Sequence, residues 1–282
     1  MHEPIMYFRS MASAQLKNSF TSIGEIESSV QPSTLTLKIS VSDTSLRYAV
    51  LSNAHQQILF FGQYTLHHVA DNKELSQRMA KIFGKDEILQ LPFAQALIGV
   101  DTPYSLLPME LTFMKNANQQ LQWCTRAAVN LAFTIDEDLK NTLQELFPEA
   151  TFVHVGSSLL ETYPLCLPQT ADKLFVNVSQ HYFDVVRFKD DNSLLMMNRY
   201  KFKTETDFIY FLLLCCEELG INRETTTLVL SGEVDKNSKV FDICYRYFKN
   251  IEFAEVPESI TFSKHFGKHA PHLHFNLYTL AA

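Results

Sequence analysis

Residues 36–66, TLKISVSDTSLRYAVLSNAHQQILFFGQYTL, and residues 174–202, LFVNVSQHYFDVVRFKDDNSLLMMNRYKF, carry one pattern twice. In each stretch apolar and polar residues alternate over three short runs, which is typical of half-buried β-strands. Three pairs of matching positions define the alignment: Ser42 with Ser179, Leu46 with Phe183, and Tyr64 with Tyr200. Because a helical pattern follows each copy, the sequence predicts a ββ-β-α unit at the start of two duplicated halves.

Further helices and strands are expected after each copy. In the first half Leu75, Met79 and Ile82 recur at helical spacing, and Asp71 and Gly84 can cap the two ends. Helices are predicted at 71–84, 136–147, 206–219 and 239–248, and strands at 95–100, 125–133, 151–155, 227–230 and 251–256. The helix at 206–219 is apolar all round, which predicts that it is covered on nearly all sides. The alternation favours an α/β fold in which each half holds a mixed sheet of about five strands with flanking helices.

The domain boundaries follow from the length and the repeat. At 282 residues the chain is long enough for two domains of roughly 150 residues each. Residues 1–33 show no sustained periodicity and are expected to form an irregular N-terminal arm that ends at Pro32. The first half is predicted at 34–168 and the second at 169–282. The stretch 163–172 holds two prolines and is the expected linker.

The composition excludes several classes of protein. Hydrophobic residues make up 46% and charged residues 20%, which is typical of a globular chain, and no run approaches the roughly 18 apolar residues of a membrane span. The net charge of −7 disfavours binding to nucleic acid. His2 and Glu3 stand where a secretory signal is basic, and five cysteines without a CxxC motif are typical of a reducing compartment. A cytoplasmic protein with no membrane or nucleic-acid partner is therefore expected.

Signatures of the common nucleotide and acyl-transfer sites are missing. Phosphate loops need glycine because the backbone must approach the phosphates closely. The chain holds only eight glycines, and it contains no GxGxxG, GxxxxGKS/T or GxSxG motif. Rossmann, P-loop and α/β-hydrolase sites are therefore disfavoured.

Two further stretches indicate a family. Residues 198–221, NRYKFKTETDFIYFLLLCCEELGI, followed by residues 227–234, TLVLSGEV, resemble an uncharacterised bacterial domain-of-unknown-function family. The repeated halves likewise resemble the actin-like ATPase (ribonuclease H-like) fold of actin, Hsp70 chaperones and sugar kinases. The family resemblance covers roughly residues 34–280 and implies a duplicated two-domain actin-like fold without an assigned activity.

The resemblance also implies where a nucleotide would bind. In active members of that superfamily the first turn of each half reads Asp-x-Gly and holds phosphate and magnesium. Here residues 43–45 (Asp-Thr-Ser) lack the glycine, and residues 179–181 (Ser-Gln-His) lack both. A third motif, which ends in Gly-Gly near the adenosine, matches residues 228–233 and keeps one glycine. The candidate nucleotide contacts in these degenerate turns are Asp43, Thr44, Ser45 and Gly232.

Two other polar runs are interpreted as structural. His272, His274 and Asn276 alternate with apolar residues, which predicts the outer face of an amphipathic strand rather than a metal site. A second alternating run also predicts a solvated strand face: Arg199, Lys201 and Lys203. No metal site is expected from the first run, and a solvated face is favoured over a basic strand for anionic partners in the second.

Three functions stay open. The leading hypothesis is a non-catalytic binding or scaffold protein, a pseudo-ATPase that keeps the two-domain frame, needs no cofactor and acts through a protein partner. The alternative is a divergent ATPase or phosphotransferase that binds Mg-ATP, with Asp43 and Asp101 holding magnesium or activating an acceptor hydroxyl. The third is self-association into a homo-oligomer through exposed aromatic and apolar residues, which an aromatic share of 12% permits.

Overall fold

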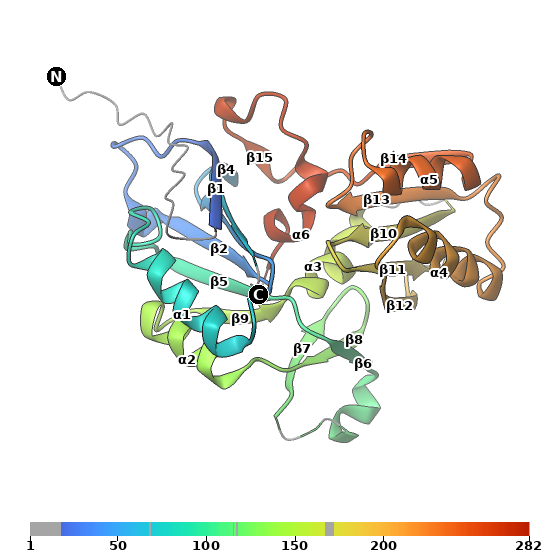
Figure 1. Cartoon of the computed structure of the whole chain (residues 1–282), viewed down its shortest axis with the longest axis horizontal. Helices are drawn as coiled ribbons and strands as arrows, with labels where there is room; N and C mark the ends of the chain where they lie inside the picture. Colours follow the sequence, from blue (N-terminus) through green and yellow to red (C-terminus); the bar gives the residue numbers. More distant parts are fainter. Residues whose placement is uncertain (1–17, 68, 115, 117, 167–171, 282) are drawn as a thin grey trace.

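The computed structural model describes residues 18–67, 69–114, 116, 118–166 and 172–281. Two sheets with their helices lie side by side, and a small third sheet lies below the junction between them (Figure 1). Within the described residues, no helix is both long and apolar enough to cross a membrane.

The first sheet contains seven strands. Their bounds are β1 (Asn18–Gly24), β2 (Leu35–Val41), β3 (Ser45–Ser52), β4 (Gln57–Leu66), β5 (Gln95–Val100), β9 (Thr151–His154) and β15 (Thr261–Phe262). The order across the sheet is β1-β4-β3-β2-β5-β9, with β15 beside β4. As the alternation predicts, β2, β3 and β4 pair antiparallel in sequence, whereas β5 is parallel to both β2 and β9.

The second sheet repeats this arrangement with five strands. They are β10 (Lys173–Val178), β11 (Tyr182–Phe188), β12 (Leu194–Lys201), β13 (Thr227–Gly232) and β14 (Asn250–Phe253). Their order, β12-β11-β10-β13-β14, corresponds strand by strand to β4-β3-β2-β5-β9 of the first sheet. The directions correspond too, because β10 is antiparallel to β11 and parallel to β13.

Helices cover both sheets. Their bounds are α1 (Asn72–Phe83), α2 (Glu137–Leu146), α3 (Val155–Thr162), α4 (Glu205–Glu218), α5 (Lys239–Tyr247) and α6 (Phe275–Tyr278). Short 3-10 helices span Pro32–Thr34, Met109–Met114, Tyr163–Cys166, Lys264–Phe266 and Pro271–His274. The predicted caps of α1 are confirmed, since the Asp71 carboxylate accepts from the Glu74 amide at 2.8 Å and Gly84 follows the last turn.

Apolar side chains form one core on the outer side of each sheet and a third between the halves. The outer cores lie under α1 and α2 and under α4 and α5. The middle core joins the two halves and the third sheet, and its largest buried side chains are Phe133, Tyr163, Phe175 and Phe275. The halves are therefore packed against each other through a continuous apolar layer.

The prediction that the helix at 206–219 is covered on nearly all sides is wrong. Tyr210 is 62% exposed and Leu214 is 39% exposed. The reason is that α4 packs with one face against the second sheet and α5, so its opposite face stays in solvent although it includes the large side chains of Tyr210 and Leu214.

The third sheet, which we call the insert, follows β5 in the chain. It contains β6 (Tyr104–Leu107), β7 (Gln120–Cys124) and β8 (Val129–Phe133) in the order β6-β8-β7. The single strand predicted at 125–133 is therefore too long, because residues 125–128 form a turn in which Ala128 has a φ of 51°. The sequence did not predict this turn, because alanine is an unusual residue for that backbone conformation.

The predicted irregular arm contains a strand. β1 pairs antiparallel with β4 along its whole length, and Phe20 packs on Tyr64 with ring centroids 4.4 Å apart. The open edge of β4 supplies hydrogen-bonding partners that the sequence of the arm alone does not reveal. Residues 1–17 and the predicted boundary between 168 and 169 lie outside the described residues.

The strand predicted around His272, His274 and Asn276 is also wrong. Pro271 starts a 3-10 helix, and α6 follows it directly, because the fixed φ of proline suits the first turn of a helix. This segment crosses back to the first sheet, where Lys38 Nζ donates to the Tyr278 carbonyl oxygen at 2.7 Å. Burial lowers the pKa of Lys38 to about 8. The end of the second half thus packs on the first.

Candidate functional site

Two matching turns face each other at the junction of the halves. Residues 42–44 link β2 to β3, and residues 179–181 link β10 to β11. The turns have the same backbone hydrogen bond, from the Ser42 amide to the Ser45 carbonyl at 2.9 Å and from the Ser179 amide to the Tyr182 carbonyl at 2.8 Å. They line one cavity of only about 10 Å³, which is the space of about one water molecule.

One side-chain oxygen of the first turn accepts from two of the turn's own backbone amides. The Ser42 hydroxyl oxygen accepts from the amides of Thr44 at 3.3 Å and Ser45 at 3.1 Å. Such bonds are typical of serine in turns. Asp43 is exposed at the edge of the cavity. The amides of Thr44 and Ser45, which could otherwise bind a phosphate, are therefore already engaged.

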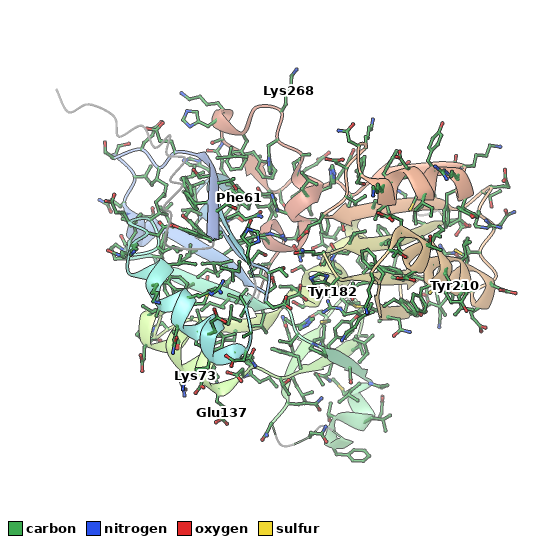
Figure 2. All side chains as sticks on the ribbon, viewed as in Figure 1. Phe61, Lys73, Glu137, Tyr182, Tyr210 and Lys268 are labelled. Atoms are coloured by element: carbon green, nitrogen blue, oxygen red, sulfur yellow. The ribbon has the colours of Figure 1, made fainter. Side chains whose placement is uncertain are left out.

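A charged network joins the halves beside this cavity. Arg199 on β12 donates to both carboxylate oxygens of Asp184, at 2.7 and 2.8 Å, and to Asp101 at 2.9 Å. The Tyr182 hydroxyl also donates to Asp101, and the Tyr104 hydroxyl donates to Asp184 at 3.0 Å. Figure 2 shows Tyr182 where the two halves meet. We call these five residues the interdomain network.

The interdomain network is buried. The side chains of Asp184, Asp101 and Arg199 are 1%, 9% and 15% exposed. The Arg199 guanidinium also lies over the Tyr182 ring, 4.0 Å from its centroid. Burial alone would lower the pKa of Arg199, but attraction to Asp184 and Asp101 outweighs it and raises that pKa. Burial, and next the charge of Asp101, raises the pKa of Tyr182, so the phenol stays a donor.

The prediction of a solvated strand face is therefore wrong for Arg199 and right for Lys201, whereas Lys203 is exposed but lies beyond the end of β12. The alternation identified the face correctly but not what packs on it. The sequence did contain one signal for a buried charge partner: Asp184 lies on the same side of β11 as the buried Val186 and Phe188. A carboxylate at such a position needs a buried partner.

His154 is a second buried polar residue that the sequence did not reveal. Its Nδ1 accepts from the Gly156 amide at 2.9 Å, and its Nε2 lies 2.8 Å from the Thr102 carbonyl oxygen. The imidazole therefore carries its proton on Nε2. Burial, helped by repulsion from Arg199, lowers the pKa of His154 to about 4. It caps α3 as a neutral side chain.

Three of the four candidate nucleotide contacts lie together. Asp43, Thr44 and Ser45 all line the small cavity. Gly232 does not line this cavity, although the next residue, Glu233, does. Glu233 forms an ion pair with Arg47 from the opposite half. Gly232 has a φ of 82°, and a Cβ there would stand 2.1 Å from the Val178 carbonyl oxygen. Close packing of β10 on β13 thus requires this glycine.

A larger pocket of about 1000 Å³ adjoins the small cavity and shares residues of both turns with it: Ser42, Asp43, His181 and Tyr182, as well as Asp101. It lies at the carboxyl ends of β2 and β5, where ligands of parallel sheets commonly bind. The starts of α1 and α2 bound it, but Asp71 and Asp136 already cap these helices. Its charged lining is mixed and includes Asp43, Asp136, Glu137, Lys140, Arg199 and Lys201. No group of three or more metal-ligating side chains occurs among the described residues.

Comparison with known families assigns the chain. A family model described as "Protein of unknown function (DUF3822)" matches residues 27–251. The chain belongs to this family. A search of the curated proteins finds no significant match to this sequence.

Solved structures identify the fold. A protein with an actin-like ATPase fold and unknown function from Bacteroides thetaiotaomicron VPI-5482 is 17% identical, with a TM-score of 0.70 over 89% of this chain and 97% of that chain. A chain of the PilM-PilN type IV pilus biogenesis complex is 10% identical, with a TM-score of 0.54 over 86% of this chain and 97% of that chain. At these identities the likeness shows the fold alone. It confirms the predicted actin-like fold class.

Proposed function

We propose that this chain is a non-catalytic, actin-like-fold binding or scaffold protein whose nucleotide-binding turns are degenerate. One observation carries the proposal: side chains from both halves fill the place between the two turns, leaving about 10 Å³. A nucleotide triphosphate with its magnesium ion needs a far larger space, because ligand pockets typically measure about 300–1,000 Å³.

The chemistry of the turns supports the same proposal. Phosphate binding uses free backbone amides, and the Ser42 hydroxyl already accepts from those of Thr44 and Ser45. Magnesium binding would use the Asp101 carboxylate, which holds Arg199 and Tyr182. Freeing Asp101 breaks one arm of a buried ion pair, and loss of such a partner costs about 3–5 kcal/mol. Nucleotide would have to bind against this cost.

A protein is the partner class that we favour. The fold of the neighbour from the type IV pilus complex occurs there in an assembly of two named proteins. The network between the halves would give a scaffold a fixed shape, which lowers the entropic cost of binding a partner. The expected cytoplasmic location and the absence of a cofactor are part of this proposal.

One observation favours the alternative of a divergent ATPase or phosphotransferase. Asp43 is exposed, and together with Asp101 it lines the 1000 Å³ pocket as well as the small cavity. A nucleotide bound in the larger pocket would meet Asp43 directly, whereas Thr44 and Ser45 line only the small cavity beside it. A titration with nucleotide decides between the two functions.

Isothermal titration of the full chain with Mg-ATP and with Mg-ADP tests the proposal. We expect no saturable binding in the micromolar range, and no release of phosphate from Mg-ATP. Micromolar affinity with hydrolysis that Asp43→Ala abolishes would establish the alternative. Asp190→Ala, which changes an exposed aspartate in a turn of the second half, is the matched control and should behave as the wild type.

A further inference from the structure

The insert ends in an exposed apolar tip. The 3-10 helix Met109–Met114 lies at the end of the insert that points away from both halves (Figure 1). Three of its side chains, which we call the apolar tip, are largely in solvent: Met109 is 60% exposed, Leu111 38% and Phe113 78%. Clustered exposure of large apolar side chains is characteristic of interaction surfaces.

The tip is a defined structure rather than a loose loop. The Leu111 amide donates to the Pro108 carbonyl oxygen at 2.9 Å, and the Thr112 hydroxyl donates to the Met109 carbonyl oxygen at 3.1 Å. These bonds hold the 3-10 turn together while the Phe113 ring stays exposed. Burying such a ring removes about 150–250 Å² of surface from water.

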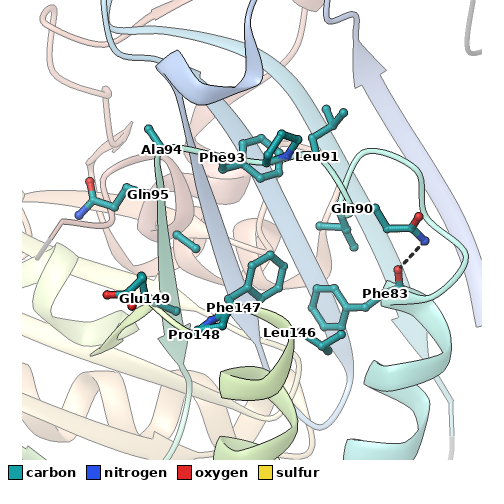
Figure 3. A pocket seen from close by; sticks show the side chains of 14 residues that line it. Phe83, Gln90, Leu91, Phe93, Ala94, Gln95, Leu146, Phe147, Pro148 and Glu149 are labelled. Atoms are coloured by element: carbon teal, nitrogen blue, oxygen red, sulfur yellow. Dashed lines mark hydrogen bonds between the residues drawn. The ribbon is translucent and has the colours of Figure 1, made fainter.

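The first half carries an apolar hollow. A pocket of about 470 Å³ lies between the last turns of α1 and α2 and the start of β5. Figure 3 shows Phe83, Phe93 and Phe147 around this hollow, with Leu91 and Leu146 beside them. The rings of Phe83 and Phe147 meet edge to face at 5.3 Å. We call this hollow the apolar pocket.

Polar groups lie around the apolar pocket without filling it. The Gln90 side chain is held by a hydrogen bond from its amide to the Phe83 carbonyl oxygen at 3.1 Å (Figure 3). Gln95 and Glu149 are exposed among its lining residues. An apolar interior with a polar border is the usual pattern of a site for an apolar anchor.

The tip cannot reach the pocket of its own chain. The pocket lies at the start of β5, at Gln95, whereas the insert leaves from the other end of that strand, after Val100. The tip lies farther still from the first sheet (Figure 1). A contact between tip and pocket therefore requires two molecules.

We propose that the chain self-associates head to tail, with the apolar tip of one copy seated in the apolar pocket of the next. The pocket is large enough for the Phe113 ring and one neighbouring side chain. Because the two surfaces differ, each bound pair keeps one free tip and one free pocket, and association continues into chains or rings. Neither surface shares a residue with the small cavity or with the 1000 Å³ pocket, so the inference holds whether or not nucleotide binds.

The strength of the contact can be bounded. A tip of three side chains buries much less than the roughly 1,200–2,000 Å² of stable interfaces, so the association is weak and depends on concentration. Two copies, each with a net charge of −7, repel each other. Added sodium sulfate screens this repulsion and strengthens apolar burial, so association increases with its concentration.

Sedimentation velocity of the full chain over a concentration series tests the inference. The average mass should rise with concentration for the wild type, and it should stay that of a monomer for Phe113→Ser and for Ala94→Glu, which places a charge at the exposed Ala94 in the pocket. Mixing these two variants restores one intact tip and one intact pocket, and the mixture should form pairs that grow no further.

Controls keep each outcome decisive. Tyr245→Ser removes an aromatic ring that is 72% exposed on α5, away from both surfaces, and should associate as the wild type. Leu146→Glu replaces Ala94→Glu if the latter lowers the melting temperature. A wild type that is monomeric at every concentration, a mixture that forms no pairs, or equal loss with Tyr245→Ser would each overturn the inference.

Discussion

Arg199 links three separate segments of the chain through one guanidinium group. It holds Asp184 in the neighbouring strand with two parallel hydrogen bonds and reaches Asp101 in the other half with a third. Paired hydrogen bonds to a carboxylate fix both its distance and its orientation. This residue therefore sets how the two halves are placed around the closed cavity.

Replacing Arg199 with alanine should lower the free energy of unfolding by about 3–5 kcal/mol, because Asp184 would be left buried without its charge partner. Urea unfolding measures the change. Arg199→Lys should be intermediate, since lysine cannot make the two parallel bonds. Arg246→Ala, at an exposed position on α5, is the control. A loss for Arg199→Ala no larger than that of the control would contradict the role given to the network.

Gly232 offers a test of its structural role against a matched glycine. Gly220 also has a positive φ, 62°, but a Cβ there meets nothing within 4 Å. Gly220→Ala should therefore cost only the conformational penalty of about 1–2 kcal/mol. Gly232→Ala adds a clash with the Val178 carbonyl oxygen and should cost more than about 3 kcal/mol. Equal losses in thermal or urea unfolding would show that the close approach is unimportant.

At this scale the sequence predicted the positions of the candidate turns better than their chemistry. Asp43, Thr44 and Ser45 do lie at the carboxyl end of β2, facing the second half. The role of Ser42 and the partners of Asp101 could not be foreseen, because the first depends on hydroxyl geometry and the second on Arg199, which is distant in the sequence. Period-two alternation tells which side a residue faces, not what it meets there.

Among the elements, the antiparallel units were predictable because their pairing is local. Alternation over residues 36–66 fixes the register between neighbouring strands. The C-terminal segment shows the limit of the method. Alternation over 272–276 is too short to separate a strand from a helical turn, and Pro271 decided for the helix.

The buried imidazole of His154, at the start of α3, predicts that the stability of the protein depends on pH. His154 stays neutral down to a pKa of about 4, compared with 6.5 for an ordinary histidine. Between these values the unfolded chain binds a proton that the folded chain does not, so the free energy of unfolding falls as the pH falls. The full loss from this one residue is about 3 kcal/mol.

Urea unfolding at several pH values from 6.5 to 4.5 measures this effect. The slope of the free energy of unfolding against pH should become shallower in His154→Gln, whose amide can keep bonds to Gly156 and Thr102. His55→Gln, in the exposed turn after β3, is the comparison and should keep the wild-type slope. Identical slopes for wild type and His154→Gln would contradict the buried neutral imidazole.

For the whole molecule, the two-sheet plan could be predicted but the way the halves are joined could not. The join depends on contacts between residues far apart in the chain: Lys38 with Tyr278, Arg47 with Glu233, and Asp101 with Arg199. Local patterns carry no information about such pairs. The self-association that we infer belongs to the same scale, because the apolar tip and the apolar pocket have meaning only between complete copies.

The return of the C-terminal segment to the first sheet has a mechanical consequence. β1 pairs with β4, and Leu280 packs with Leu97 and Val153, so both ends of the described chain are anchored in the first half. Tension applied between these ends would act on the first sheet. The second half lies between two segments that are both anchored in the first half, so it would carry little of the force. The second half would keep its shape until the first had given way.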